Sequence, residues 1–215
     1  MQDRLKLSDL EHEIRAGKNA AKARILQRFF KTGPGQYGEG DIFLGLTVPE
    51  QRKISAHYGH LSFPDLKKLL LSPIHEFRLI ALLILVKKYQ AAKADKEKDA
   101  LARFYLSQAR RTNNWDLVDL SAPQIAGEYF FRHREKQAER DAMAASSNLW
   151  SRRIAMLSTF YDIRQGQAGP AFRLAKKLLA DKHDLMHKAA GWMLREAGKR
   201  ADKIGRASCR ERVYH

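Results

Sequence analysis

The chain has 215 residues, 44% of them hydrophobic and 30% charged, and this balance excludes a disordered chain and an integral membrane protein. Forty Lys and Arg residues against 24 Asp and Glu residues give a formal net charge of +16. Such an excess favours a polyanionic partner, because phosphates that basic side chains neutralise release their counterions. Nucleic acid is the preferred partner class, although membrane surfaces and acidic proteins also attract basic chains.

Nothing in the sequence predicts export or membrane insertion. The longest apolar run, residues 79–86, is shorter than the roughly 18 residues of a membrane span. The first residues include Asp3, Arg4 and Lys6 instead of an apolar signal core, so we expect a cytosolic protein.

Residues 204–215 contain the single cysteine, Cys209, and read like the in-frame translation of a sequencing adapter. We therefore interpret residues 1–203 as one domain and residues 204–215 as a non-native tail. From residue 205 on, the tail holds three arginines against one glutamate, so its removal lowers the charge from +16 by 2 to +14. The charge argument survives, and Cys209 carries no disulfide, metal or nucleophile role.

Helical periodicity is the one strong pattern, and it predicts an all-α fold. Residues 8–30 place apolar residues at helical spacing among basic ones. Residues 32–46 hold five glycines and a proline and are predicted as a loop. Pro49 then begins a helix at a position where its missing N–H is harmless. Further helices are expected over residues 63–71, 75–89, 95–110, 115–131, 150–164, 170–180 and 184–199.

A weak internal repeat organises these helices. Each of four segments places a polar residue three positions before an alanine that we expect to be buried: residues 78–81, 119–122, 152–155 and 187–190. The alanines follow one another at intervals of 41, 33 and 35 residues, close to the period of two-helix HEAT-like units. Such units stack into a helical-repeat solenoid, an α-α superhelix, here with a basic concave face. Asp119, Arg152 and His187 are then expected to line one surface.

The most informative stretch is residues 112–119, which read Thr-Asn-Asn-Trp-Asp-Leu-Val-Asp. Trp115 and Asp119 are four positions apart and therefore share one face of a helix, which Asn113 or Asn114 is suited to cap. Asp116 favours the helix dipole in the first turn, whereas Asp119 lies beyond the dipole's useful range. The pattern alone leaves two interpretations open: a functional pair, or a core tryptophan beside an exposed charge.

Residues 115–119 resemble the active-site helix of the HEAT-like-repeat DNA alkylation-repair glycosylases, the AlkD-type family. Three more segments resemble that family in register and in order: residues 43–52, 148–155 and 187–196. The likeness runs from about residue 20 to Lys203.

The resemblance implies roles for the matching residues. Asp119 matches the catalytic carboxylate, and Trp115 and Trp192 match aromatic residues that contact the lesion nucleotide. Arg153 matches a residue that grips the DNA near the lesion. Asn114 departs from the pattern of some members, which carry a second tryptophan there. Further phosphate contacts are implied for Arg152, Arg195 and Lys188.

The implied activity is that of a monofunctional glycosylase that removes N3- or N7-alkylated purines from double-stranded DNA, with no cofactor and no metal. Such a base is already cationic, so it leaves without a proton and needs no general acid. Positive charge develops on the deoxyribose instead, and an anionic carboxylate in a partly dry site stabilises it. Aromatic faces beside the sugar and the base add cation–π attraction of about 0.5–2 kcal/mol each.

The resemblance further implies that the duplex lies along the concave face, with the lesion stacked rather than flipped into a pocket. We expect a monomer, because repeat solenoids of this size are often monomeric. Two other functions stay open. One is a non-catalytic HEAT-like module that binds nucleic-acid backbone through the same basic face, and the more remote one is a protein–protein scaffold.

Three further patterns favour structural roles. His183 and His187 have a spacing that suits zinc, but no third ligand lies near them in the sequence, so surface or cap roles are favoured. The glycine-rich residues 33–40 follow a helix and lack the Lys-Ser/Thr ending of a phosphate loop, so we predict a flexible connection. A basic cluster either grips phosphate or forms a solvated face: Arg132, Arg134, Lys136 and Arg140.

Overall fold

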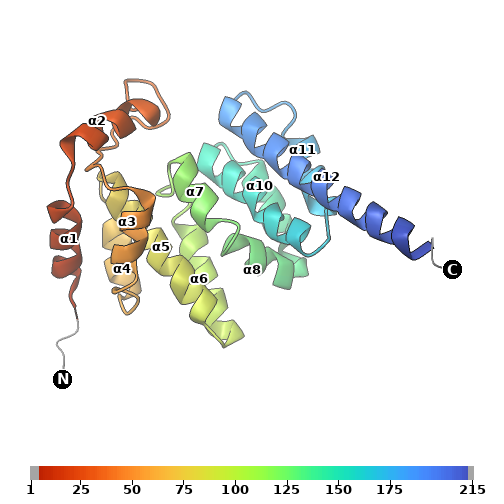
Figure 1. The fold of residues 1–215 in the computed structure, drawn as a ribbon, viewed down its shortest axis with the longest axis horizontal. Helices are drawn as coiled ribbons and strands as arrows, with labels where there is room; N and C mark the ends of the chain where they lie inside the picture. The colour runs from red at the N-terminus through yellow and green to blue at the C-terminus, as the bar shows by residue number, and fades with distance from the viewer. Residues whose placement is uncertain (1–4, 213–215) are drawn as a thin grey trace. The chain divides into compact units, whose positions relative to one another are not determined.

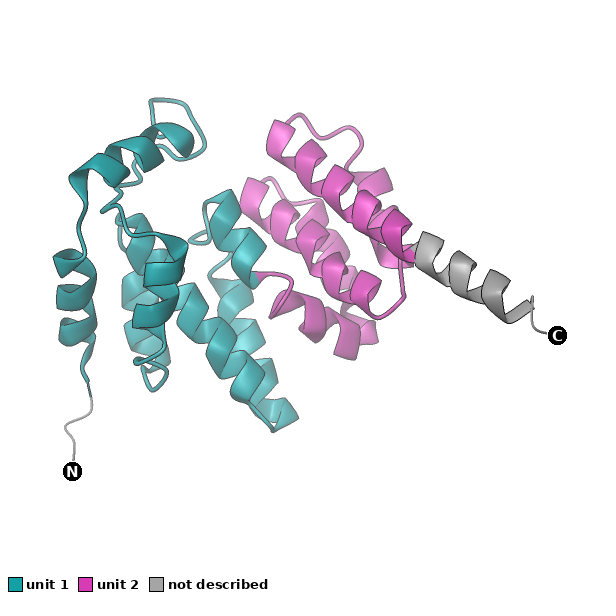
Figure 2. Cartoon of the chain, viewed as in Figure 1, with its two compact units in different colours: residues 1–121 teal, residues 122–215 magenta. Residues whose placement is uncertain are grey.

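The computed structural model describes residues 5–212, and the side chains of residues 5–200. Within this range it contains twelve α-helices, one 3₁₀ helix and no β-strand, which confirms the prediction of an all-α fold (Figure 1). The chain divides into two compact units, unit 1 (Met1–Ser121) and unit 2 (Ala122–His215) (Figure 2). No helix in the described range is both long enough and apolar enough to cross a bilayer.

Unit 1 is built around one buried helix, α5. Its elements are α1 (Leu7–Ala16), α2 (Ala20–Phe29), α3 (Val48–Ser55), α4 (Phe63–Leu70), α5 (His75–Ala91), α6 (Asp95–Ser107) and α7 (Trp115–Ser121). Residues 75–86 of α5 are all buried, because α3, α4, α6 and α7 pack against this helix. Complete burial explains why residues 79–86 are apolar on every side of the helix.

Unit 2 has a similar plan, with α10 at its centre. Its elements are α8 (Ala126–Arg132), the 3₁₀ helix η1 (Arg134–Lys136), α9 (Gln137–Ala144), α10 (Leu149–Arg164), α11 (Gly169–Lys177) and α12 (Asp184–Arg212). α10 packs against α8, α9, α11 and α12. The suggestion of a non-native tail from residue 204 falls on side chains that lie outside the described residues.

Two segments that the sequence predicts as continuous helices are each divided in the structure. Residues 8–30 form α1 and α2, because the chain turns at Gly17 and Asn19 caps α2 by accepting a hydrogen bond from Lys22 N at 3.0 Å. Residues 115–131 form α7 and α8, with Pro123 between them, which lacks the N–H that a continuous helix requires. The predicted loop over residues 32–46 is confirmed.

The segment with the basic cluster contains a helix that the sequence analysis missed, α9. Arg140 of α9 is fully buried, and its Nη1 lies 2.6 Å from Asp162 Oδ2. Arg134 Nη1 lies 3.1 Å from the other carboxylate oxygen, Oδ1. The prediction of a phosphate grip or a solvated face is therefore wrong for Arg140. We name Arg134, Arg140 and Asp162 the Asp162 cluster.

The alanines of the proposed repeat are buried in three of the four segments. Ala81, Ala122 and Ala155 are at most 1% exposed. In the fourth segment Ala190 is only partly buried, and its neighbour Ala189 is the fully buried residue. The alignment of that segment is thus wrong by one position.

Candidate active site

A cavity of about 380 Å³ lies within unit 1, and residues of α7 form part of its wall. Most of its lining is apolar or aromatic: Leu26, Phe29, Phe30, Phe43, Leu46, Val48, Leu79, Trp115 and Leu120. The polar lining residues are Thr47, Gln51, His75, Asp116 and Asp119. Carboxylates in an otherwise apolar pocket are a feature of binding and catalytic sites.

Trp115 and Asp119 both line this cavity, one turn apart on α7. The indole of Trp115 is partly exposed and stacks on Phe30, with ring centroids 5.2 Å apart and an interplanar angle of 24°. Phe29 meets the same indole edge-on at 5.9 Å. The structure therefore brings these two predicted site residues together and fixes the indole between α7 and the end of α2.

Asp119 is partly exposed at the cavity. Its charge also acts on Tyr105, whose hydroxyl lies 2.9 Å from Ser121 Oγ. Burial raises the pKa of the Tyr105 phenol above its ordinary value; the hydrogen bond with Ser121 opposes this shift and the charge of Asp119 adds to it. Asp119 thus combines access to the cavity with a partly apolar surrounding.

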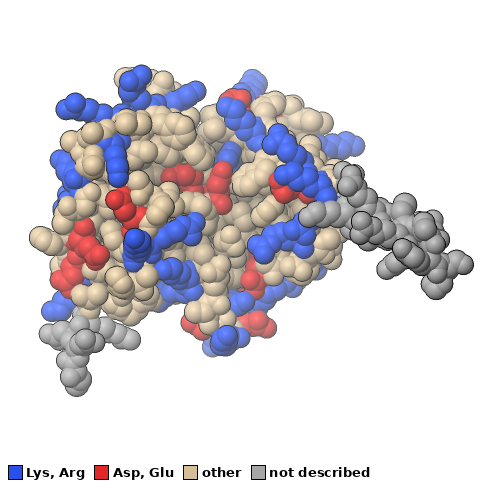
Figure 3. Space-filling view, viewed as in Figure 1, with Lys and Arg blue, Asp and Glu red and all other residues tan. Residues whose placement is uncertain are grey.

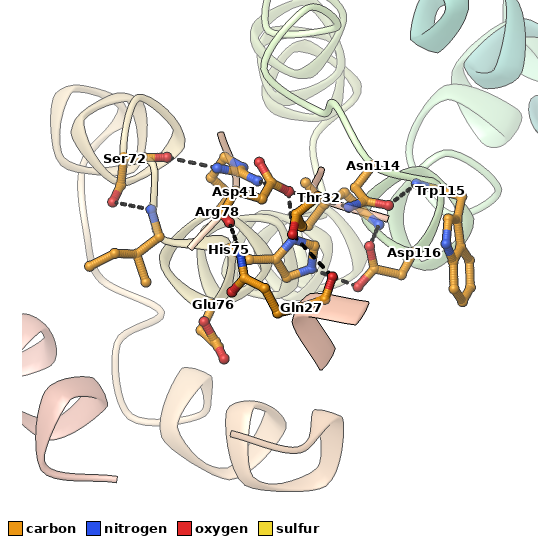
Figure 4. Close-up of polar contacts among 12 residues, drawn as sticks. Gln27, Thr32, Asp41, Ser72, His75, Glu76, Arg78, Asn114, Trp115 and Asp116 are labelled. Atoms are coloured by element: carbon orange, nitrogen blue, oxygen red, sulfur yellow. Dashed lines mark hydrogen bonds and ion pairs between the residues drawn. The ribbon is translucent and has the colours of Figure 1, made fainter. Parts of the chain in front are cut away.

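A buried polar network, drawn in Figure 4, adjoins the cavity and contributes two of its lining residues, His75 and Asp116. It consists of Asp41, His75, Arg78, Asn114 and Asp116, and we name it the His75 network. His75 Nε2 lies 2.8 Å from Asp116 Oδ2, and His75 Nδ1 lies 3.3 Å from Asp41 Oδ2. Arg78 Nη2 lies 2.6 Å from the same Asp41 oxygen. Two carboxylates and two cationic groups therefore share one buried region.

The network determines how α7 begins. Asn114 is fully buried; its Oδ1 accepts a hydrogen bond from Trp115 N at 2.8 Å, and its Nδ2 donates to Asp41 Oδ2 at 3.2 Å. Its backbone carbonyl accepts the first helical hydrogen bond, from Val118 N. Asn114 rather than Asn113 thus occupies the cap position, and its buried side chain has a structural role.

The charge state of His75 follows from its partners. Burial opposes the imidazolium form, but the charge and the hydrogen bond of Asp116, helped by Asp41, raise the pKa of His75 to about 9. Burial likewise opposes ionisation of Asp41, but the hydrogen bond from His75 and the charge of Arg78 lower its pKa. At neutral pH the network therefore holds an imidazolium between two carboxylates.

A third buried carboxylate, Glu76, shapes the loop that carries Phe43. Its oxygens accept hydrogen bonds from the backbone N–H groups of residues 44, 45 and 46 at 2.8–3.3 Å. Gly45 has φ +97°, and a Cβ there would lie 2.2 Å from Asn19 O, so the loop approaches α2 as closely as only glycine allows. Sequence reasoning missed Glu76 and the His75 network, although His75 and Glu76 stand out as polar residues at the start of an apolar helix.

The other predicted site residues belong to unit 2. Trp192 on α12 is partly exposed, and its ring centroid lies 5.9 Å from that of Phe160. Arg153 is 4% exposed, and its Nη1 donates to Leu185 O at 2.6 Å. Arg153 therefore ties α10 to α12, and its interior position was not foreseen.

The three remaining basic residues differ in how firmly they are held. Arg152 Nε donates to Asp181 Oδ2 at 2.6 Å. Burial raises and the hydrogen bond from Arg152 lowers the pKa of Asp181, which ends below its ordinary value. Arg195 is exposed, and Lys188 is exposed with its Nζ 2.7 Å from Asp184 Oδ2.

The histidine pair of unit 2 forms local contacts. His183 Nδ1 accepts a hydrogen bond from Leu185 N at 3.2 Å, and His187 Nε2 contacts the backbone carbonyl of Asp181. Among the residues whose side chains are described, no three His, Cys, Asp or Glu side chains come together as a possible metal site.

Comparisons with known proteins agree with this fold and give the family. Residues 10–207 match the family model of the DNA alkylation repair enzymes. A solved structure, described as "Predicted DNA alkylation repair enzyme from Enterococcus faecalis", shares the fold with a TM-score of 0.64 and 17% identity, over 90% of this chain and 89% of that chain. Among functionally curated proteins, none matches the sequence significantly. The family model covers most of the chain, which therefore belongs to the DNA alkylation repair enzyme family, and its function lies in the repair of alkylated DNA.

Proposed function

We propose that the chain is a monofunctional DNA glycosylase, which hydrolyses the N-glycosidic bond of cationic N3- and N7-alkylated purines in duplex DNA. One observation carries the proposal: Asp119 and Trp115 line the same largely apolar cavity. Such an enzyme meets its substrate in the cytosol, which in a bacterium contains the nucleoid.

Asp119 is the catalytic carboxylate in this proposal. The alkylated purine carries its positive charge into the reaction, so the bond to the sugar breaks without protonation of the base. Positive charge accumulates on the deoxyribose, where the carboxylate of Asp119 stabilises it and orients the water that attacks the sugar. An apolar surrounding strengthens this attraction, because fewer water dipoles compete with it.

The aromatic residues hold the cation. Trp115 presents a partly exposed indole that Phe29 and Phe30 keep in place, and cation–π attraction is worth about 0.5–2 kcal/mol for each such face. Trp192 is the second indole of the proposal, contributed by unit 2. The lesion nucleotide stays stacked in the duplex while its sugar faces Asp119.

Basic residues of both units hold the DNA backbone. Figure 3 shows Lys and Arg side chains over α2, which has no buried residue and carries Arg24 and Arg28. In unit 2, Arg195 and Lys188 are exposed, and in this proposal they contact phosphates. Arg152 is hydrogen-bonded to Asp181, and Arg153 is 4% exposed and donates to Leu185 O, so in this proposal both act by holding α10 against the start of α12 near the exposed Arg195 and Lys188.

Base release from a duplex with one N7-methylguanine tests the proposal. We expect the wild type to release the base, and Asp119→Asn to bind the duplex but to react about a hundredfold more slowly or worse, because the substitution removes the charge that faces the sugar. Asp99→Asn is the matched control, since it removes the same charge from α6, which does not line the cavity.

Each outcome separates the candidate functions. Equal release by the wild type and Asp119→Asn would remove this carboxylate from the mechanism. Tight, strongly salt-dependent binding by a wild type that releases no base would favour a non-catalytic nucleic-acid-binding module, to which the net charge of +16 also points.

A further inference from the structure

The His75 network connects two segments of unit 1 to the first turn of α7. Asp41 lies in the loop after α2, His75 and Arg78 lie in the first turn of α5, and Asn114 and Asp116 lie at the start of α7 (Figure 4). The proposed reaction uses none of these side chains directly.

Both neighbours of Trp115 are tied to the network. Asp116 joins the imidazole to the helix, because one of its carboxylate oxygens lies 2.8 Å from His75 Nε2 and the other accepts a hydrogen bond from Leu117 N at 2.8 Å. Asn114 joins Asp41 to Trp115 N. The backbone of the first turn of α7 is therefore fixed from both sides of the indole.

Ring contacts provide a second connection. The imidazole of His75 stacks on Phe43, with centroids 4.5 Å apart and an interplanar angle of 23°. It also lies 5.2 Å from Phe30, the ring on which Trp115 stacks. His75 thus contacts the aromatic wall of the cavity as well as the polar start of α7.

We propose that His75 is a positioning residue of the candidate site: its imidazolium, held between Asp41 and Asp116, fixes the first turn of α7 and so directs the indole of Trp115 and the carboxylate of Asp119 toward the cavity. His75 is 2% exposed, so it acts through these neighbours and not by contact with DNA. Its effect on base release rests on the proposed function, whereas its effect on Trp115 does not.

The charged groups around His75 make this positioning of α7 sensitive to alkaline pH. Asp116 on α7, Asp41 in the loop and Arg78 on α5 face the imidazole directly. Glu76, the next residue of α5, accepts hydrogen bonds from backbone N–H groups of the loop, and Asp119 lines the same cavity. With a His75 pKa of about 9, the ion pair with Asp116 is complete at pH 7 and disappears above pH 9.

A titration of the free protein by NMR tests the positioning without DNA. The chain has three tryptophans, and Trp115→Phe identifies the indole Cδ1–H signal of Trp115. We expect this signal to shift with a midpoint near pH 9 in the wild type. In His75→Gln it should differ from the wild type at pH 7 and lack that midpoint.

Single-turnover base release measures the consequence for the reaction. At pH 7 we expect His75→Gln to slow release by about tenfold to a hundredfold at saturating enzyme, with duplex affinity unchanged within about twofold, because a misplaced catalytic group lowers the rate more than the binding. The ratio of wild-type to variant rate should fall toward one above pH 9. Titration of the substrate affects both proteins equally and cancels in this ratio.

Two more variants keep the test decisive. Asp116→Asn keeps the shape of the partner but removes its charge, so it should lose the same pH dependence if His75→Gln folds poorly. Tyr58→Phe is the structural control, because it removes a partly buried hydrogen bond to Glu13, 2.9 Å long, elsewhere in unit 1.

The results separate this inference from the proposed function. A Trp115 signal that is identical in the wild type and His75→Gln at every pH overturns the positioning role. A wild type that releases no base overturns the proposed function, while the NMR titration still decides the inference. Equal loss of rate in Tyr58→Phe and His75→Gln would show a general stability effect and would also overturn it.

Discussion

Among the described residues, unit 1 buries the His75 network and unit 2 buries the Asp162 cluster, and the two have different surroundings. The His75 network of unit 1 adjoins the cavity, and two of its members, His75 and Asp116, form part of the cavity wall. The Asp162 cluster of unit 2 joins η1 and α9 to α10, with Arg140 and Asp162 both fully buried.

The chemistry of the cations differs as well. Burial lowers the pKa of Arg140 and the charge of Asp162 opposes this shift, but an arginine starts from so high a pKa that the pair in the Asp162 cluster stays ionic at neutral pH. The pKa of His75 is raised to about 9, so its ion pairs with Asp41 and Asp116 hold only while the imidazole is charged. The buried charge of Arg140 therefore stabilises the fold of unit 2. The buried charge of His75 lies beside the candidate site of unit 1, so its loss is expected to affect that site.

The largest expected effect on stability comes from breaking the Asp162 cluster. Arg140→Ala leaves Asp162 buried with fewer partners, and a buried charge that loses its partner destabilises a fold by about 3–5 kcal/mol. Urea unfolding followed by circular dichroism measures the change. Folded Arg140→Ala should release base at the wild-type rate, which His75→Gln should not.

Lys136→Ala provides the control from the same segment. Lys136 is exposed on η1, so its removal should change the free energy of unfolding by less than about 0.5 kcal/mol. An Arg140→Ala variant as stable as this control would show that the Asp162 cluster contributes nothing to the fold.

The next largest effect is a loss of stability with rising pH that depends on His75. The pKa of His75 is raised from 6.5 to about 9 in the folded protein, so its contribution is complete below about pH 6.5 and is lost as the pH rises through 9. The shift corresponds to about 3 kcal/mol as an order of magnitude, because one pKa unit is worth about 1.4 kcal/mol.

The measurement is the difference in unfolding free energy between the wild type and His75→Gln from pH 6 to pH 9.5. The pKa of His183 is lowered by burial and nearby charges, but both proteins contain this residue and its effect cancels. A difference that stays constant across this range would mean that the imidazole does not titrate with the predicted sign.

The sequence predicts well where a signal is local. The run of residues 115–119, with a cap before it and an aromatic residue one turn before a carboxylate, predicts both α7 and the pairing of Trp115 with Asp119, and the structure has both at one cavity. The apolar residues 79–86 predict a buried helix for the same reason, because hydrophobic periodicity depends on near neighbours.

Prediction fails where the partner is distant in the sequence. His75 meets Asp41 and Asp116, which are 34 and 41 positions away, and no local pattern indicates these contacts. From the sequence, Arg140 is predicted to lie at the surface. In the structure it is buried, because Asp162, 22 positions later, neutralises its charge. α9 was not predicted, because its sequence, QAERDAMA, has few large apolar residues that would indicate a buried face.

The smallest expected effects concern phosphate contacts, and they compare the two units directly. Lys188 and Asp184 are 67% and 70% exposed, so their ion pair is weak and leaves Lys188 available to DNA. We expect Lys188→Ala and Arg195→Ala each to weaken duplex binding irrespective of sequence and to reduce the slope of log affinity against log salt by about one.

Arg24→Ala and Arg28→Ala test α2 of unit 1 in the same way, and Lys96→Ala, at an exposed position on α6, is the control for loss of one positive charge. Reduced slopes for variants of both units would show that both contact the backbone. A slope changed only by the variants of α2 would assign the phosphate contacts to unit 1 and would remove Lys188 and Arg195 from the DNA interface.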